Sequence, residues 1–166
     1  LSGSITTSND IYAYGIYNLG DSNTTTVSGS ITTGTGNTTY GIFNLGNNNK
    51  TTVSETGSIT TGTGNGAIGI YNDGAFNTTT VSGSIKTTGA SAYGISNNQN
   101  NKTTVSGSIV TTGAGAHGIA NYGSDNVTTI SGTVKATGAK SAALYSAGGD
   151  GNSFTLNEGA TIIGDI

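Results

Sequence analysis

Hydrophobic and small residues alternate with polar ones along short stretches of this chain. In Thr79–Thr87, every second residue is small or apolar, and the residues between them are Thr, Ser or Lys. A period of two is typical of a β-strand with one buried face, and no apolar stripe follows the helical period of about 3.6. The pattern predicts one strand, or two strands with a bend at Gly83.

The same pattern recurs every 24 to 28 residues. Each repeat reads V-S-G-S-I-T-T, a Gly-rich link, Y-G-I-Y-N, an Asn- and Gly-rich loop, and N-T-T-T. The repeats begin at Leu1, Val27, Val53, Val81, Val105 and Ile130, and a tail covers residues 157–166. Repeats this short bury a hydrophobic face only by stacking. We therefore predict one all-β domain, a right-handed parallel β-helix (β-solenoid) of about six coils.

The Y-G-I-Y-N motif predicts a second strand. Its central aliphatic residue should form an inward column: Ile16, Ile42, Ile70, Ile95, Ile119 and Leu144. In a regular strand the residue two positions earlier shares that face. Tyr14, Tyr40 and Tyr93 are therefore expected to point inward, and the intervening glycines outward.

Two features of the V-S-G-S-I motif need an explanation. The Gly, such as Gly83, occupies an inward position. Either the chain turns a corner there, or a Tyr of the opposite wall packs over it. One repeat also carries an insertion, Glu55-Thr56, which we interpret as a β-bulge because two extra residues preserve the inward and outward parity.

Two columns of Asn recur at fixed positions. The first lies two residues after the aliphatic column and comprises Asn18, Asn44, Asn72, Asn97 and Asn121. The second lies four residues before each new repeat and comprises Asn23, Asn49, Asn77, Asn101, Asn126 and Asn152. Stacked Asn side chains can hydrogen-bond along a column, and Asn suits turns. Both columns are predicted to be structural ladders, which also accounts for the N-x-T sequons within them.

The composition excludes several classes of protein. The chain has 29 Gly and no Pro, Cys, Met or Trp, and its net charge is −3. Without Cys it has neither disulfides nor thiolate metal sites. The lack of Arg and the acidic balance argue against nucleic acid as a partner. No apolar run is long enough for membrane insertion of this segment.

The repeat V-S-G-S-I-T-T-x-G-x-x-A-Y-G-I-Y-N-x-G-x-x-N-T-T resembles passenger regions of bacterial autotransporters (type V secretion) and the repeats of large surface adhesins. The tail, Leu156–Ile166, is similar to passenger sequence as well. The resemblance implies a right-handed β-helix exported to the extracellular space or the cell surface. It also implies a stalk, fibre, adhesin or enzyme platform. Because an export signal and a translocator barrel are absent from these residues, we expect a fragment or a processed subunit.

The candidate chemistry is sparse. No two acidic residues occupy equivalent positions in adjacent repeats, so the carboxylate pair of a polysaccharide-cleaving enzyme is not expected. Gly148–Asn152 resembles one calcium-binding nonapeptide, but its neighbour, Tyr122–Asn126, does not match, which favours a Gly-rich turn. The lone His117 is interpreted as a packed side chain. We predict no catalysis, no cofactor and no metal site.

Two outward surfaces are candidate binding sites. A hydroxyl face is formed by Thr26, Thr52, Thr80, Thr104 and Thr129, beside a column of Ser. Regular Thr arrays resemble ice-binding solenoids, although this second column lacks the Thr methyl. An aromatic column is formed by Tyr17, Phe43 and Tyr71. It could seat a sugar ring or a protein, or its rings could simply pack on one another.

The sequence thus favours a structural rod, stalk or fibre segment of a secreted bacterial surface protein, in an adhesion or extracellular-matrix context. The alternatives are a glycan- or ice-binding module and a head-to-tail filament subunit. Partners are expected to be further copies of the chain or a host or matrix glycan or protein. Because neither end carries a capping segment, stacking of copies would satisfy the open strand edges.

Overall fold

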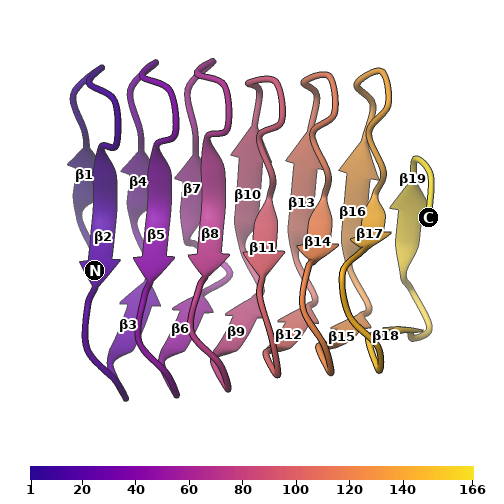
Figure 1. Cartoon of the computed structure of the whole chain (residues 1–166). Helices are drawn as coiled ribbons and strands as arrows, with labels where there is room; N and C mark the ends of the chain where they lie inside the picture. Colours follow the sequence, from indigo (N-terminus) through magenta and orange to yellow (C-terminus); the bar gives the residue numbers. More distant parts are fainter.

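The computed structural model describes residues 1–166 and contains nineteen strands and no helix. The chain winds repeatedly through three parallel sheets, each coil contributing one strand to each sheet (Figure 1). Sheet A comprises β1 (Ser4–Thr6), β4 (Ser30–Thr32), β7 (Ser58–Thr60), β10 (Ser84–Thr87), β13 (Ser108–Thr111), β16 (Thr133–Ala136) and β19 (Thr161–Ile163). Sheet B comprises β2 (Tyr14–Asn18), β5 (Tyr40–Asn44), β8 (Ile68–Asn72), β11 (Ile95–Asn97), β14 (Ile119–Asn121) and β17 (Leu144–Ser146). Sheet C comprises β3 (Thr24–Val27), β6 (Lys50–Val53), β9 (Thr78–Val81), β12 (Lys102–Val105), β15 (Val127–Ile130) and β18 (Ser153–Leu156).

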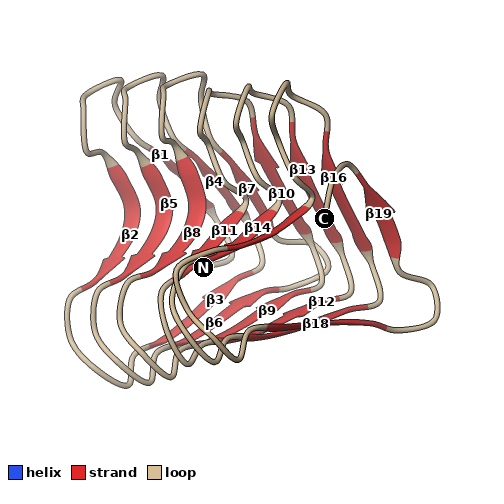
Figure 2. Cartoon of the chain, turned by 45° about the vertical axis from the view of Figure 1, so that its right-hand side comes forward, coloured by secondary structure: helices blue, strands red, loops and turns tan.

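Equivalent strands of successive coils pair in parallel and in register. Ile31 pairs with Ile59, and Ile59 pairs with Ile85, as the repeat spacing predicts. The tail continues the winding, because β19 pairs with β16. Figure 2 shows the coils stacked side by side along one axis. The all-β parallel β-solenoid of about six coils is thereby confirmed, while its predicted hand stays a prediction.

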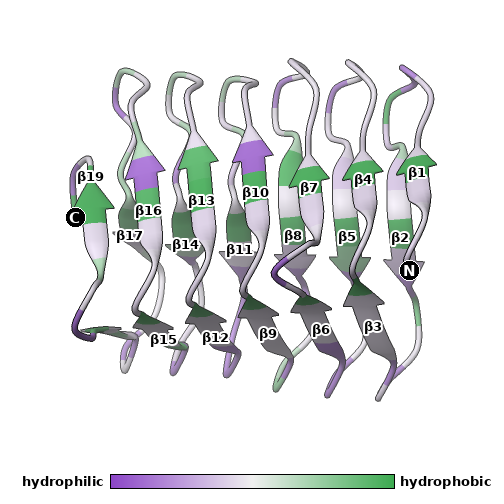
Figure 3. Ribbon diagram, turned by 180° about the vertical axis from the view of Figure 1, so that it is seen from behind, coloured by the Kyte–Doolittle hydropathy of each residue, from purple (hydrophilic) through white to green (hydrophobic).

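A narrow hydrophobic core runs along the axis of the rod. Seventeen buried residues, nearly all Val and Ile, form one continuous cluster. A hydrophobic band crosses the strands of sheet A at a constant height (Figure 3). The core also includes one Thr from each of several sheet C strands, for example Thr51, Thr79 and Thr103, which are fully buried. Polar groups therefore lie inside the coil as well as around it.

The glycine of the V-S-G-S-I motif marks a corner between sheets C and A. The chain forms two strands here, β9 and β10, on either side of Ser82–Gly83. A Cβ atom at Gly83 would collide with the carbonyl oxygens of Gly57 and Ser54, so the backbones of neighbouring coils approach closely. The corner explanation is therefore confirmed, and no Tyr covers this glycine from inside.

The Glu55-Thr56 insertion is not a β-bulge. These residues lie in a turn after β6 ends at Val53 and before β7 begins at Ser58. The Gly57 amide donates to the Ser54 carbonyl at 2.8 Å and closes this turn. The insertion is accommodated because the corner is already outside both strands, where extra residues disturb no ladder.

The predicted inward column of Tyr is also wrong. Tyr14 is exposed, and Tyr40, Tyr93 and His117 are half-buried on the outer face of sheet B. Gly41 and Ile42 are both buried, so the strict alternation fails at this point. A Cβ at Gly41 would collide with Ile59 and would lie 2.6 Å from the Gly69 carbonyl oxygen. Gly41 thus provides the close approach between coils, and the Tyr before it points outward.

Two positions in every coil adopt a left-handed backbone conformation. One lies before the Y-G-I-Y-N motif, at Tyr12, Thr38, Gly66, Ser91, Gly115 and Lys140. The other lies directly before the second Asn column, at Ser22, Asn48, Phe76, Asn100, Asp125 and Gly151. All nine non-Gly residues with positive φ belong to these two columns. The turns are thus conserved in shape from coil to coil although their sequences differ.

Candidate functional site

The first Asn column forms a continuous hydrogen-bonded ladder inside the rod. Each Nδ2 donates to the Oδ1 of the next coil, at 2.7 Å from Asn18, 2.8 Å from Asn44, 2.8 Å from Asn72 and 2.9 Å from Asn97. Each Nδ2 also donates to the hydroxyl of a Thr on sheet C, as Asn72 does to Thr79 at 3.0 Å. Because Asn44, Asn72 and Asn97 are fully buried, these bonds replace those to water.

The second Asn column connects the coils through the backbone. The Oδ1 atoms accept from the amide of the preceding Asn in the column, at 2.7 Å between Asn49 N and Asn77 Oδ1. The Nδ2 atoms donate to the carbonyl three residues earlier, as Asn77 does to Gly74 at 2.9 Å. Each side chain thus closes its own turn and holds the turn of the coil before it.

Coil four departs from this second ladder. Only three residues, Asn98–Asn100, separate the two Asn columns there, whereas four separate them in coils three and five, at 73–76 and 122–125. The Nδ2 of Asn101 is buried and has no hydrogen-bond partner. The carbonyl of Asn98, three residues earlier, accepts instead from Asn126 Nδ2 at 2.6 Å. The shorter loop therefore disturbs the ladder at this coil.

The hydroxyl face is a single regular column on the outside of sheet C. Thr26, Thr52, Thr80, Thr104, Thr129 and Thr155 pair in register from coil to coil. The Ser column beside it lies on the corner, beyond the ends of the strands. The column on the other side is mixed and contains the exposed Lys50 and Lys102. A flat array two hydroxyl columns wide is therefore not formed.

Aromatic side chains collect on the outer face of sheet B. In coils one to three the rings stack on one another, with centroid distances of 5.3 Å between Tyr17 and Phe43 and 5.1 Å between Phe43 and Tyr71. Tyr14 and Tyr40, which the sequence placed inside, stack beside them at 5.3 Å. Tyr17, Phe43 and Tyr71 lie in one outward column, as the repeat pattern predicts. Both faces of the Phe43 ring are covered by its neighbours.

A second aromatic group lies over coils four to six. His117 stacks on Tyr145 with ring centroids 4.1 Å apart and planes 2° from parallel. Its Nδ1 accepts a hydrogen bond from the Ala142 amide at 3.0 Å. Burial lowers the pKa of His117. His117 therefore lies in the outer aromatic face, not in the core column.

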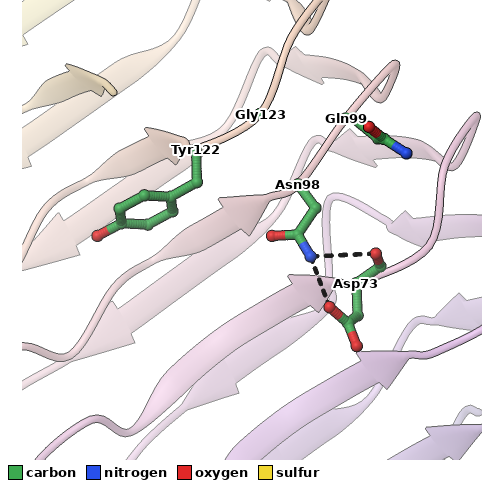
Figure 4. Close-up of a pocket in the computed structure, with 5 residues that line it drawn as sticks. All are labelled: Asp73, Asn98, Gln99, Tyr122 and Gly123. Carbon is green, nitrogen blue, oxygen red and sulfur yellow. Dashed lines mark hydrogen bonds between the residues drawn. The ribbon is translucent and has the colours of Figure 1, made fainter. Parts of the chain in front are cut away.

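A hollow of about 400 Å³ lies at the loops that follow β8, β11 and β14 of sheet B. Its lining residues are Asp73, Asn98, Gln99, Tyr122 and Gly123, which come from three successive coils (Figure 4). The Nδ2 of Asn98 donates to Asp73 Oδ1 at 2.5 Å and to the Asp73 carbonyl at 3.1 Å. The sequence reasoning missed this site, although the shorter loop of coil four was a visible signal for it.

The electrostatics of the hollow centre on Asp73. The Tyr71 hydroxyl donates to Asp73 Oδ1 at 3.0 Å. Burial, together with this hydrogen bond, raises the pKa of Tyr71 to about 12. Burial also raises the pKa of Tyr122, aided by the neighbouring Tyr93. Both phenols stay protonated near neutral pH, so the carboxylate of Asp73 is the charge in this region that a ligand would meet.

No group of three or more His, Cys, Asp or Glu side chains is placed to hold a metal ion. Asp125 and Asp150 are joined only through the backbone, where the Asp125 amide donates to the Asp150 carbonyl at 2.9 Å. The structure also contains no helix that could cross a membrane.

These features define the class of molecule as a parallel β-solenoid built from a structural repeat. The chain matches no protein-family model, and neither a curated protein nor a solved structure shows significant similarity to it.

Proposed function

We propose that this chain is a stretch of structural rod from a secreted bacterial surface protein of the autotransporter-passenger or adhesin type. The observation that carries the proposal is the in-register stacking of every coil, joined by two Asn ladders. A stack of equivalent coils resists bending because each coil pairs along three sheets at once. Such a rod spaces or displays other parts of a protein, and it needs no catalytic group, cofactor or metal.

Surface location can be tested in a bacterium that carries the gene, with an antibody raised against this segment. Intact cells are treated with a protease that cannot enter them. We expect the antibody to label intact cells and the protease to remove the label. The proposal would be contradicted if the antibody labelled only lysed cells. It would also be contradicted if the segment stayed intact when whole cells were treated with the protease.

Head-to-tail association of copies is a second candidate role. Its support is geometric, because β1–β3 at one end and β17–β19 at the other each have a neighbouring strand on one side only. A second copy in the same register would extend all three sheets, and the contact would propagate into a filament. Electron microscopy and sedimentation of material isolated from cells should show filaments. A monomer, or one much longer chain, would refute this role.

A further inference from the structure

The hollow described above forms a notch in the surface of the rod at the shorter loop of coil four. Loops 73–76 and 122–125 each have one residue more than loop 98–100, which lies between them in the stack. The hollow lies at this place, on the border of sheet B, and it is lined by all three loops. Its volume of about 400 Å³ falls within the range of small-molecule sites.

The lining combines one aromatic ring with a polar cluster. Tyr122 stands where coils one and two carry Leu19 and Leu45. Its ring is tilted by 45° from Tyr93 and meets Tyr145 at 61°, so it does not join a parallel stack. Asp73 Oδ1 already accepts from Tyr71 and Asn98, so Asp73 Oδ2 and the side-chain carbonyl of Asn98 are acceptors open to a ligand, and Gln99 adds a second amide.

We infer that this notch is a binding site for a neutral sugar residue, a function beyond that of the rod. A pyranose presents one apolar face of C–H groups, which suits an aromatic ring, and a rim of hydroxyls that donate and accept hydrogen bonds. A carboxylate beside amides is suited to adjacent hydroxyls, and hydrogen bonds to the charged group are the stronger ones.

The charge of the site selects among sugars. Asp73 is the one charged residue among the five that line the hollow. A sialic acid or uronic acid would place a second carboxylate near it without a cation to compensate. Neutral hexoses and N-acetylhexosamines avoid this repulsion.

The notch is also better suited to a sugar than the stacked aromatic column is. The faces of Phe43 are covered by Tyr17 on one side and Tyr71 on the other. The column of rings then stops, since coil four carries Ser96 and coil five carries Ala120 in the same register. Tyr122 is the aromatic residue that lines the hollow, and no second ring is stacked parallel to it.

The test uses an array of glycans that end in neutral hexoses or N-acetylhexosamines, with sialylated and uronic-acid glycans as the anionic arm. The neutral sugars that bind are then titrated as methyl glycosides, and backbone amide shifts are followed by NMR. We expect binding of one or more neutral sugars, with shifts concentrated at Asn98, Gln99 and Gly123.

Three variants use residues that the chain already tolerates at equivalent positions. Tyr122→Leu introduces the residue of coils one and two, and Asp73→Asn introduces the residue of coil four. Each should weaken binding about tenfold or more, as expected for a lost stacking contact or charged hydrogen bond. Tyr17→Ser, which introduces the residue of coil four at the far end of the aromatic face, should leave binding unchanged. Urea midpoints of all three establish that the variants are folded.

Four results would overturn the inference. These are an array on which no neutral glycan binds, binding confined to anionic glycans, binding that Tyr122→Leu and Asp73→Asn leave intact, and binding that Tyr17→Ser abolishes. The last result would place the ligand on the stacked column instead. None of these results would affect the proposed role as a rod.

Discussion

At the scale of single residues, the left-handed turn positions carry the clearest strain. Nine of them are occupied by residues other than Gly, with φ between 50° and 60°. Thr38 is the one β-branched residue among them. A branched Cβ crowds the backbone in this conformation more than Asn or Gly does. Coils three and five carry Gly66 and Gly115 at the same position.

Thr38→Gly should therefore stabilise the protein, by about 1 kcal/mol, because relief of strain outweighs the greater freedom of Gly in the unfolded chain. The control is Thr32→Gly in the exposed last position of β4, which should destabilise by about 0.5–1 kcal/mol. Urea unfolding followed by circular dichroism measures both. A lower midpoint for Thr38→Gly would show that the turn is not strained.

His117 should make the free energy of unfolding depend on pH. Its pKa in the folded chain lies below the unfolded value of 6.5, so folding favours the neutral ring. Above pH 6.5 the neutral ring of His117 makes its full contribution to the free energy of unfolding. As the pH falls below 6.5, the unfolded chain takes up a proton first, and the free energy of unfolding decreases until the folded pKa is passed.

We expect His117→Tyr, which continues the column of Tyr14, Tyr40 and Tyr93, to lose less stability than the wild type between pH 7.5 and pH 5. Melting temperatures of both proteins at the two pH values measure the difference. The acidic residues are the same in both, so their contribution cancels. Equal losses would show that His117 is not the group that titrates.

At the scale of elements, the hydrogen bonds of the Asn columns should contribute to the free energy of unfolding by stabilising the turns. Asn77 is fully buried, and its Oδ1 and Nδ2 both make hydrogen bonds. Asn47 lies in the same type of loop, but its one side-chain bond, from the Ala75 amide at 2.8 Å, is exposed. Asn77→Ala should therefore destabilise more than Asn47→Ala, by about 1–3 kcal/mol, because it leaves buried groups unpaired. Equal urea midpoints would refute the structural role of the second ladder.

The glycine of the second strand should tolerate no side chain. In Gly41→Ala the new methyl group would meet the Ile59 side chain and the Gly69 carbonyl, both in the next coil. We expect a loss of about 1–3 kcal/mol, as for overpacked cores. Gly20→Ala is the control, because its Cβ would meet only Asn23 Nδ2 at 3.8 Å. Its urea midpoint should stay close to that of the wild type, and a comparable loss for both would contradict the packing argument.

At the scale of the whole molecule, stability should vary along the rod. Coils two to five have a neighbour on each side, whereas the strands of coil one pair on one side only. The core residues of coil one, Ile5 and Ile16, are only partly buried, while Ile42 and Ile70 are fully buried. Stability in a solenoid is approximately a sum over coils and their interfaces, so the coils at the two ends should open more readily than the central ones.

Amide hydrogen exchange measured by NMR checks this prediction. Amides of β8 and β11 should exchange most slowly, and those of the end strands, β1–β3 and β17–β19, fastest, because central coils open only with the whole stack. Uniform protection from β2 to β14 would instead show that the rod unfolds as a single cooperative unit.

The repeat spacing was enough to determine the solenoid, its register and its two Asn ladders. Ile31, Ile59 and Ile85 recur at equivalent positions, and only parallel stacking brings them into one column. The ladders followed for the same reason, since identical residues at identical positions must lie one above another. Local alternation likewise placed Thr79 and Val81 inside.

The orientation of the Tyr column and the site in the notch were decided by the tertiary structure. Strict alternation placed Tyr40 inside, but Gly41 and Ile42 are both buried, and the close approach of Gly41 to the next coil leaves the Tyr on the outer face. The notch arises because three loops of unequal length are brought side by side, so that Asp73, Asn98 and Tyr122 line one hollow. The repeat pattern shows which residues successive coils have in common. The space available inside the core and the contacts between loops of different sequence exist only once the coils are stacked.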